Sequence, residues 1–235
     1  MPRSLDQFAK QRDVVLRDDA GKLPSGDRDA LLGKAITERY SKDRPLQLAS
    51  DVNGAASNLL ALPTSSGGTF EEGFSIVKTI EFPIGDAPPT LIDDANWRMY
   101  RTPTALKIML DILAPSASDT LRITWTARHK DDATTVPDPD FYAVCDLAAA
   151  LCYEALAGIY AQTGDASLSA DSVNYRTKSQ EYLSLAKALA KRYYEHLGIN
   201  PSDTGAATGP AGASFSMHET MGWGGDRLTH PRSTR

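Results

Sequence analysis

The sequence contains little of the chemistry from which metal and cofactor sites are built. Its 235 residues include only four histidines and two cysteines, and none of them stands at the His-x-His, His-x3-His or Cys-x2-Cys spacing of a metal site. The phosphate-binding motif G-x4-G-K-[ST] is missing, and no G-x-G-x2-G follows a predicted strand. These absences predict a chain with no metal, no cofactor and no nucleotide site.

Long hydrophobic runs and excess positive charge are missing as well. No apolar run approaches the roughly 20 residues of a membrane span, and residues 1–13 lack the apolar core of a signal peptide. The net charge is -5, whereas a general nucleic-acid binder carries a basic face. Hydrophobic residues make up 41% and charged residues 23%, as in a globular protein. We expect a protein of the cytoplasm without membrane contact.

The two cysteines, Cys145 and Cys152, are seven positions apart in a helical pattern. Seven residues make about two helical turns, so both side chains lie on one face, about 10 Å apart along the helix. A disulfide cannot span that distance. We therefore expect both to be reduced thiols in a core.

The candidate catalytic residues are three pairs of aspartates, and each pair lies beside a predicted turn or helix start. Acid–base catalysis often uses a carboxylate pair, but aspartate at a helix start is commonly a cap. We interpret Asp138 and Asp140 as capping groups and the other pairs as solvated loop charges. A small hydrolase that uses one pair is the alternative from the enzyme class. The pairs are Asp93 with Asp94, Asp131 with Asp132, and Asp138 with Asp140.

Four helices are predicted from apolar residues that recur at spacings of three and four. Pro45 prevents the second helix from continuing, and Gly198 is a typical helix stop. The small residues of the third helix allow its neighbours to approach closely. The predicted helices, with their caps, are 5–19 (Ser4 or Asp6), 27–44 (Asp27), 137–162, and 172–197 (Asp171 or Ser172).

Between the second and third helices the apolar period changes from 3.6 to 2, which is typical of antiparallel strands. Residues 121–128 are the clearest strand, with one apolar and one polar face. Segments 97–101 and 105–113 are expected to pair through a turn at Thr102 and Pro103. The residues expected to share faces are Phe74, Ile76, Lys78, Ile80 and Phe82; Leu106, Ile108, Leu110 and Ile112; and Leu121, Ile123, Trp125 and Ala127.

The predicted fold class is α+β: a four-helix bundle-like body with an inserted antiparallel β-rich subdomain and an extended C-terminal tail. The expected divisions are helices in 1–45, the β-rich insert in 46–130, helices in 131–199 and the tail in 200–235.

Charged and aromatic residues at helix ends are the candidate subunit contacts. The second helix ends in the charged segment 39–45. One interpretation is that Lys42 and Arg44 complement the helix dipole, and the other is that Arg39, Asp43 and Arg44 bridge to a neighbouring subunit. Tyr194 is turned about 100° from Tyr193 on the helix and is placed at a subunit contact. The aromatic residues Trp97, Tyr100 and Trp125 are interpreted as packing the β-rich insert.

The C-terminal tail is rich in Gly, Ser, Thr and Pro and cannot bury enough apolar area to order its own backbone. Spaced along it are the apolar residues Phe215, Met217, Met221 and Trp223. Glycines around them let an extended backbone lie close to another surface. This pattern is typical of a docking peptide, and the alternative is a tail folded back onto its own domain.

Five segments together resemble the head-tail connector proteins (neck adaptor or head completion proteins) of tailed bacteriophages. None is a catalytic signature, and the resemblance rests on their joint order over residues 5–198. The segments are RYSKDRP (39–45), EFPIG (81–85), WRMYRTP (97–103), LRITWTARH (121–129) and DSVNYRTKSQEYLSLAKALAKRYYEHLG (171–198).

The resemblance implies a structural virion protein that is not an enzyme. Such a protein forms a homo-oligomeric ring, usually dodecameric, which binds the portal protein and the tail terminator or tail tube protein and lines the channel for DNA. Its place is the neck of the virion, assembled in the cytoplasm of the bacterial host. The β-rich insert departs from the smallest, nearly all-helical connectors. A tail-completion protein or another ring-forming protein of a phage tail is the alternative within the same class.

Overall fold

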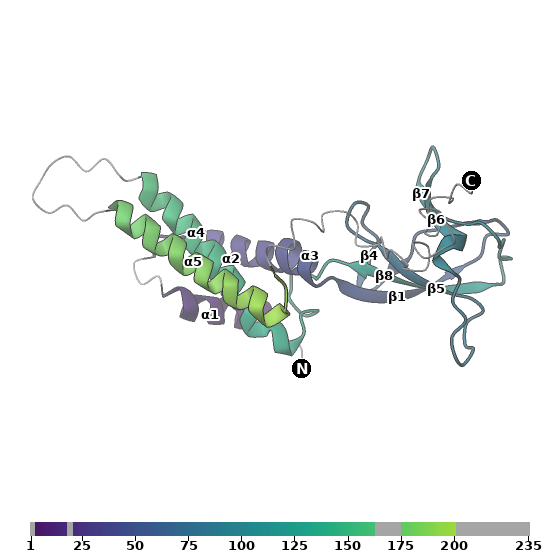
Figure 1. The fold of residues 1–235 in the computed structure, drawn as a ribbon, viewed down its shortest axis with the longest axis horizontal. Helices are drawn as coiled ribbons and strands as arrows, with labels where there is room; N and C mark the ends of the chain where they lie inside the picture. The colour runs from purple at the N-terminus through teal and green to yellow at the C-terminus, as the bar shows by residue number, and fades with distance from the viewer. Residues whose placement is uncertain (1–2, 18–20, 163–174, 201–235) are drawn as a thin grey trace, which may run out of the picture.

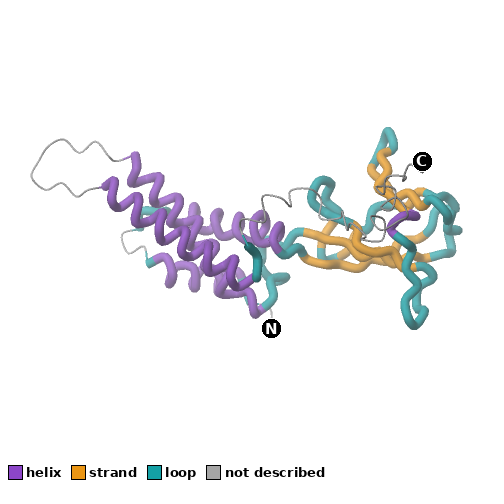
Figure 2. The backbone as a smooth tube through the Cα atoms, in the orientation of Figure 1, coloured by secondary structure: helices purple, strands orange, loops and turns teal. Residues whose placement is uncertain are grey.

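A computed structural model of the chain describes residues 3–17, 21–162 and 175–200. Over these residues it combines helices with antiparallel sheets, so the predicted α+β class is confirmed. Helices gather at one end of an elongated molecule and strands at the other (Figures 1 and 2). The tail residues Phe215, Met217, Met221 and Trp223, and the expected caps Asp171 and Ser172, lie outside the described residues.

The helices of the described residues are α1 (Leu5–Leu16), α2 (Ser25–Lys34), the π-helix η1 (Ala35–Tyr40), α3 (Ser41–Asp43), the 3-10 helices η2 (Asp94–Asn96) and η3 (Asp138–Asp140), α4 (Phe141–Gln162) and α5 (Tyr175–Leu197). The strands are β1 (Leu46–Asn53), β2 (Leu59–Leu60), β3 (Thr64–Ser65), β4 (Gly68–Thr69), β5 (Val77–Glu81), β6 (Trp97–Arg101), β7 (Leu106–Leu110) and β8 (Thr120–Ala127).

Helix α4 is the central helix, and α1, α2 and α5 all pack against it. Its alanines Ala148 and Ala149 are fully buried, which lets the neighbouring backbones approach. By length and composition α4 meets the criterion for a membrane span, contrary to the sequence expectation, but most of it is buried against the other helices. Cys145 and Cys152 are both buried and free, as predicted.

Two helix starts test the predicted caps. Ser4 caps α1 in a capping box with Gln7, whose side chain accepts from the backbone N–H of Ser4 at 3.1 Å. The second helix begins earlier than predicted, because the carbonyl of Pro24 already accepts from the N–H of Arg28 at 3.1 Å. Asp27 therefore lies in the first turn of α2, and its prediction as the cap is wrong.

The strands form two three-stranded antiparallel sheets, in the orders β1-β8-β5 and β2-β7-β6, and β3 pairs with β4 in a two-stranded sheet. Apolar residues of the two larger sheets share one core cluster. On β8 the predicted apolar face is confirmed, since Leu121, Ile123, Trp125 and Ala127 are all buried. The indole N–H of Trp125 donates to Ser50 Oγ of β1 at 3.0 Å, which satisfies the polar atom of this buried ring.

Other face predictions fail at irregularities of the sheets. The pairing of β5 shifts register between Val77 and Thr79, so Val77 and Ile80 are both buried, and strict alternation from Phe74 is wrong. Ile112 lies beyond the end of β7 and is 70% exposed. Tyr100 is also exposed, because β6 turns that side chain away from the core face.

Candidate functional site at the junction and in the sheets

A buried carboxylate ties three helical segments together where the helices meet the sheets. Asp140 of η3, only 1% exposed, accepts a hydrogen bond from the Tyr40 hydroxyl of η1 at 2.5 Å. Arg44 Nη1 donates to its two oxygens at 3.0 and 2.7 Å, and His196 Nε2 of α5 donates at 3.0 Å. We call Asp140, Tyr40, Arg44 and His196 the junction cluster.

Charge and hydrogen bonding decide the protonation state of this cluster. Burial alone would raise the pKa of Asp140, but the hydrogen bonds from Tyr40 and His196 and the nearby charge of Arg44 outweigh it and lower that pKa. Burial, and then the bond to Asp140, raise the pKa of Tyr40 far above its usual range. Asp140 is thus an anion whose oxygens are occupied by donors of its own chain, an arrangement that holds structure.

His129, just after β8, connects the last strand to the end of the second helical segment. Its backbone N–H donates to Ser41 Oγ at 2.9 Å. Nε2 lies 2.9 Å from the carbonyl oxygen of Arg44, so Nε2 carries the proton and Nδ1 accepts from Thr135 Oγ1 at 3.1 Å. Burial lowers the pKa of His129, which keeps the ring neutral near pH 7.

The four predicted contact residues all lie at this junction. Arg44 belongs to the junction cluster, and Asp43 accepts from the Tyr193 hydroxyl at 2.8 Å. Arg39 is exposed, and its positive charge acts on both Asp43 and Tyr194. Tyr194 is half-buried against the core of its own helices. The structure thus brings the four residues together, and their role in a subunit contact stays a prediction.

Asp140 was interpreted from the sequence as a helix cap, and that interpretation is wrong. Its oxygens bind Tyr40, Arg44 and His196, which are 100, 96 and 56 positions away in the sequence. No local spacing signals contacts of that kind. Asp138, its neighbour, forms an ion pair with Arg3 at 3.1 Å. Within the described ranges, no three His, Cys, Asp or Glu side chains are grouped to hold a metal ion.

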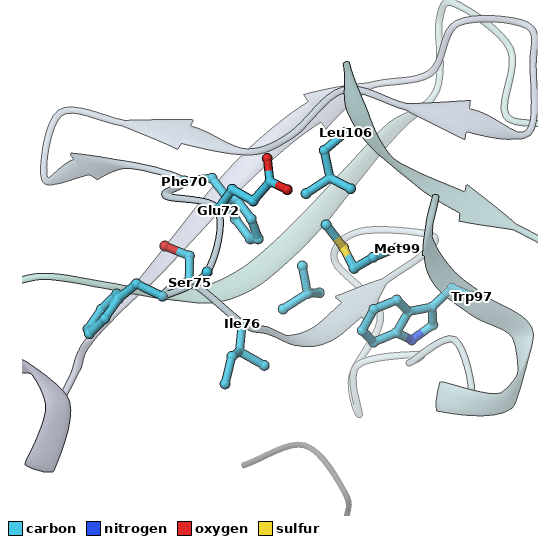
Figure 3. Close-up of a pocket in the computed structure, with 10 residues that line it drawn as sticks. Phe70, Glu72, Ser75, Ile76, Trp97, Met99 and Leu106 are labelled. Carbon is cyan, nitrogen blue, oxygen red and sulfur yellow. The ribbon is translucent and has the colours of Figure 1, made fainter. Parts of the chain in front are cut away.

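A second feature is an apolar cavity of about 420 Å³ in the β-rich part, which we call the β6 groove (Figure 3). One side comes from residues 70–77, and the other from Trp97 and Met99 of β6 with Leu106 of β7. Trp97 and Met99 are two apart on a strand, so they point to the same face. The volume lies within the roughly 300–1,000 Å³ of typical ligand pockets.

Two ion pairs hold the segment 70–76 in place as a wall of the groove. Glu72 pairs with Arg101 at the end of β6. Glu71 pairs with Arg128 at 2.6 Å, and the guanidinium of Arg128 lies 4.5 Å from the centre of the Phe74 ring. Arg128 also donates to the carbonyl of Thr37 in η1 at 3.3 Å, so this wall is connected to the helices.

The groove lies beside an open strand edge. Strand β6 pairs only with β7 in the described sheets, which leaves its other edge open. An apolar cavity beside an open strand edge suits an extended peptide with an apolar side chain. No sequence pattern had indicated this groove.

No family model matches the chain, and no curated protein matches it. It is similar to a chain in the solved structure "Virion of native gene transfer agent (GTA) particle", with 16% identity over 74% of this chain and 87% of that chain and a TM-score of 0.26. For a chain in "Neck of empty GTA particle computed with C6 symmetry" the identity is 17%, the coverage is 74% of this chain and 87% of that chain, and the TM-score is 0.26. For a chain in "Neck of native GTA particle computed with C12 symmetry" the identity is 16%, the coverage is 74% of this chain and 86% of that chain, and the TM-score is 0.25. TM-scores of this size carry no argument about fold or function.

Proposed function

We propose that this chain is a structural, non-enzymatic protein of a phage virion neck. Copies of it form a homo-oligomeric ring, dodecameric by the resemblance, that joins the portal protein to the tail terminator or tail tube protein and lines the DNA channel. The observation that supports the proposal is the position, in the structure, of the segments that carry the resemblance to head-tail connector proteins. RYSKDRP supplies Tyr40 and Arg44 of the junction cluster, and the last segment, 171–198, supplies His196.

The other segments build the neighbouring features. LRITWTARH contains strand β8 and ends with His129, and WRMYRTP contains β6 with Trp97 and Met99 of the groove. The segments that carry the resemblance therefore make up a scaffold that connects helices to sheets. A ring subunit has to keep its surfaces in a fixed relation, and a directional network of buried hydrogen bonds meets that need.

The contact between neighbouring copies is proposed at the exposed side of the junction. A cyclic ring repeats one heterologous pair of patches around its axis. Arg39, Asp43, Arg44 and Tyr194 provide both signs of charge and an aromatic ring in one place. Because Arg39 is exposed and is not part of the junction cluster, it is the member that is free to contact another copy. The net charge of -5 suits a channel in which DNA slides without binding.

Phe215, Met217, Met221 and Trp223 are proposed as the anchors that bind the portal protein. Interface energy concentrates in buried aromatic residues, so Phe215→Ala or Trp223→Ala should weaken binding more than the matched change Thr204→Ala. Equal effects of the three changes on portal affinity, measured by interferometry, would argue against anchoring by these residues. Deletion of residues 201–235 with no effect on portal binding would do the same.

The ring itself is tested by electron microscopy of the purified full chain with its portal, viewed along the assembly axis. We expect ring-shaped particles, and Arg39→Glu should reduce their number while the far-UV circular dichroism stays unchanged. The matched control is Lys10→Glu on α1, an exposed residue away from the junction. Monomers under all conditions, with and without portal, would refute the proposal. A ring that binds a tail component and not the portal would favour the tail-completion alternative.

A further inference from the structure

One side of the β6 groove is formed by apolar residues of the β2-β7-β6 sheet, namely Trp97, Met99 and Leu106. The core between the sheets contains Ile108 and Leu110 of β7, both fully buried. In the ladder these residues lie opposite Met99 and Trp97 of β6. Met99 is nevertheless 37% exposed. An apolar face is therefore left partly uncovered at the edge strand.

We propose that the β6 groove binds the C-terminal segment of the same chain, residues 201–235, through Phe215 and Met217 or through Met221 and Trp223. Each of these pairs is two positions apart. In an extended peptide such pairs project from one face, which is also how Trp97 and Met99 project from β6. A peptide added along the open edge of β6 would place one pair over the uncovered face.

The open edge of β6 specifies what else the occupant provides. Strand β6 pairs only with β7 in the described sheets, so the backbone N–H and C=O groups of an added peptide can pair with those on its other edge. The groove is lined mainly by apolar side chains, and its charged neighbour Glu72 is paired with Arg101. Between Pro201 and Arg235 the sequence has three acidic and three arginine residues, so its side-chain charges balance.

The position where the described chain ends favours this segment over an outside partner. The hydroxyl of Tyr193 near the end of α5 donates to Asp43 of α3, three residues before the chain enters β1 at Leu46. The tail thus starts at the junction, beside the sheets. The 15 residues from Pro201 to Phe215 can span up to roughly 50 Å. A tether of this length gives an effective concentration in the millimolar range, which a separate partner rarely reaches.

This inference does not require the proposed function, because groove and segment belong to one chain. Taken together with the proposed function, it has one consequence: a portal protein that binds Phe215 or Trp223 has to displace the C-terminal segment from the groove. The two proposals fail separately, since occupancy of the groove is measured on the free protein and portal binding on the complex.

Hydrogen–deuterium exchange on the full-length protein tests the contact from both sides. Met99→Glu should speed exchange of the amides in residues 213–225 roughly tenfold, as expected when about 1.4 kcal/mol of docking is lost. Phe215→Ser combined with Trp223→Ser should in turn speed exchange of β6. The matched controls are Tyr100→Glu, on the opposite face of β6, and Thr204→Ala. Residues 213–225 that exchange at the free-peptide rate in the unaltered protein would overturn the proposal.

Disulfide trapping covers the case in which Met99→Glu disturbs the sheets. A Met99→Cys, Trp223→Cys variant should form a disulfide within one chain under mild oxidation, seen as a faster-migrating monomer on a non-reducing gel. Cys145 and Cys152 are buried and do not compete. A Tyr100→Cys, Trp223→Cys variant is the control and should form little disulfide. A disulfide-linked dimer, or equal trapping in both variants, would overturn the assignment to the chain's own groove.

Discussion

Two aspartates at the junction should respond differently when each is replaced by asparagine: the Asp140 variant should lose stability, and the Asp43 variant should not. Asp140 and Asp43 both accept a hydrogen bond from a tyrosine hydroxyl, at 2.5 Å from Tyr40 and 2.8 Å from Tyr193. Their surroundings differ. The pKa of Asp140 is lowered by its donors, whereas burial is the largest influence on Asp43 and raises its pKa. The charge of Asp140 is therefore stabilising, and that of Asp43 is destabilising.

The size of the Asp140 effect follows from its partners. Hydrogen bonds that involve a charged group contribute about 1.5–3 kcal/mol each, and Asp140 is almost fully buried. The side chains of Arg44 and His196 are 57% and 42% exposed, so water replaces part of what they lose. We expect Asp140→Asn to lower the free energy of unfolding at pH 7 by about 2–3 kcal/mol. Asp43→Asn keeps an acceptor for Tyr193 and should change it by less than about 0.5 kcal/mol, or raise it.

The dependence on pH distinguishes the two charges. The folded pKa of Asp140 lies below its unfolded value of 3.8, so its contribution is complete above that value and is lost as pH falls through the folded pKa. The difference between the unaltered protein and Asp140→Asn should thus shrink below about pH 4. The folded pKa of Asp43 lies above 3.8, so any gain from Asp43→Asn is present at neutral pH and disappears as pH falls through that folded pKa.

Urea unfolding followed by circular dichroism at several pH values from 7 to 3 measures both effects. Comparable slopes of free energy against urea would show that the variants expose the same surface on unfolding. Equal losses at pH 7, or a larger loss for Asp43→Asn, would refute the assignment of a stabilising charge to Asp140. An Asp140→Asn loss that persists unchanged at pH 3 would refute the ionic part of the argument.

Two further predictions concern packing. A Cβ at Gly54 would lie 2.2 Å from the carbonyl oxygen of Ser116, so Gly54→Ala should destabilise the folded protein by about 1–3 kcal/mol. A Cβ at Gly33 in α2 would have no atom within 4 Å, so Gly33→Ala should stabilise the folded protein by about 0.5–1 kcal/mol. Thermal unfolding ranks the two variants, and the opposite order would contradict the close approach of Gly54 to Ser116. Burial raises the pKa of Cys145 to about 12, so this thiol should not react with a thiol reagent at pH 8 until urea unfolds the protein. Mass spectrometry measures the labelling, and rapid labelling of Cys145 in the native protein would contradict its burial.

Regular elements were predictable because their signal is a local period. The spacing of three and four placed the helices, and the spacing of two placed the apolar face of β8. The prediction failed where a single residue breaks the period. The register shift between Val77 and Thr79 buries both Val77 and Ile80, and alternation gives no sign of it. In the same way, Pro24 starts α2 before Asp27, the better cap by residue type.

The candidate site was predictable only in part. The charged helix end at residues 39–45 was singled out because charges concentrate there, and Arg44 and Asp43 indeed make contacts at the junction. The central member, Asp140, was assigned a local role because the sequence shows only its neighbours. Its partners come from two segments far from it in the chain, residues 40–44 and His196, and the fold alone brings them together. The β6 groove depends in the same way on the relation of two sheets.

The way in which the two parts of the molecule are joined bears on what it can do. None of the three apolar core clusters in the described residues combines helix residues with strand residues. The connection is polar: Arg128 contacts both Thr37 of η1 and Glu71 of the groove wall, and His129 connects β8 to the carbonyl of Arg44. Apolar contacts tolerate sliding, whereas hydrogen bonds with fixed donors and acceptors set an orientation. The junction therefore fixes the direction in which the sheets project from the helices, which is the property that identical subunits need if their contacts are to close into a ring.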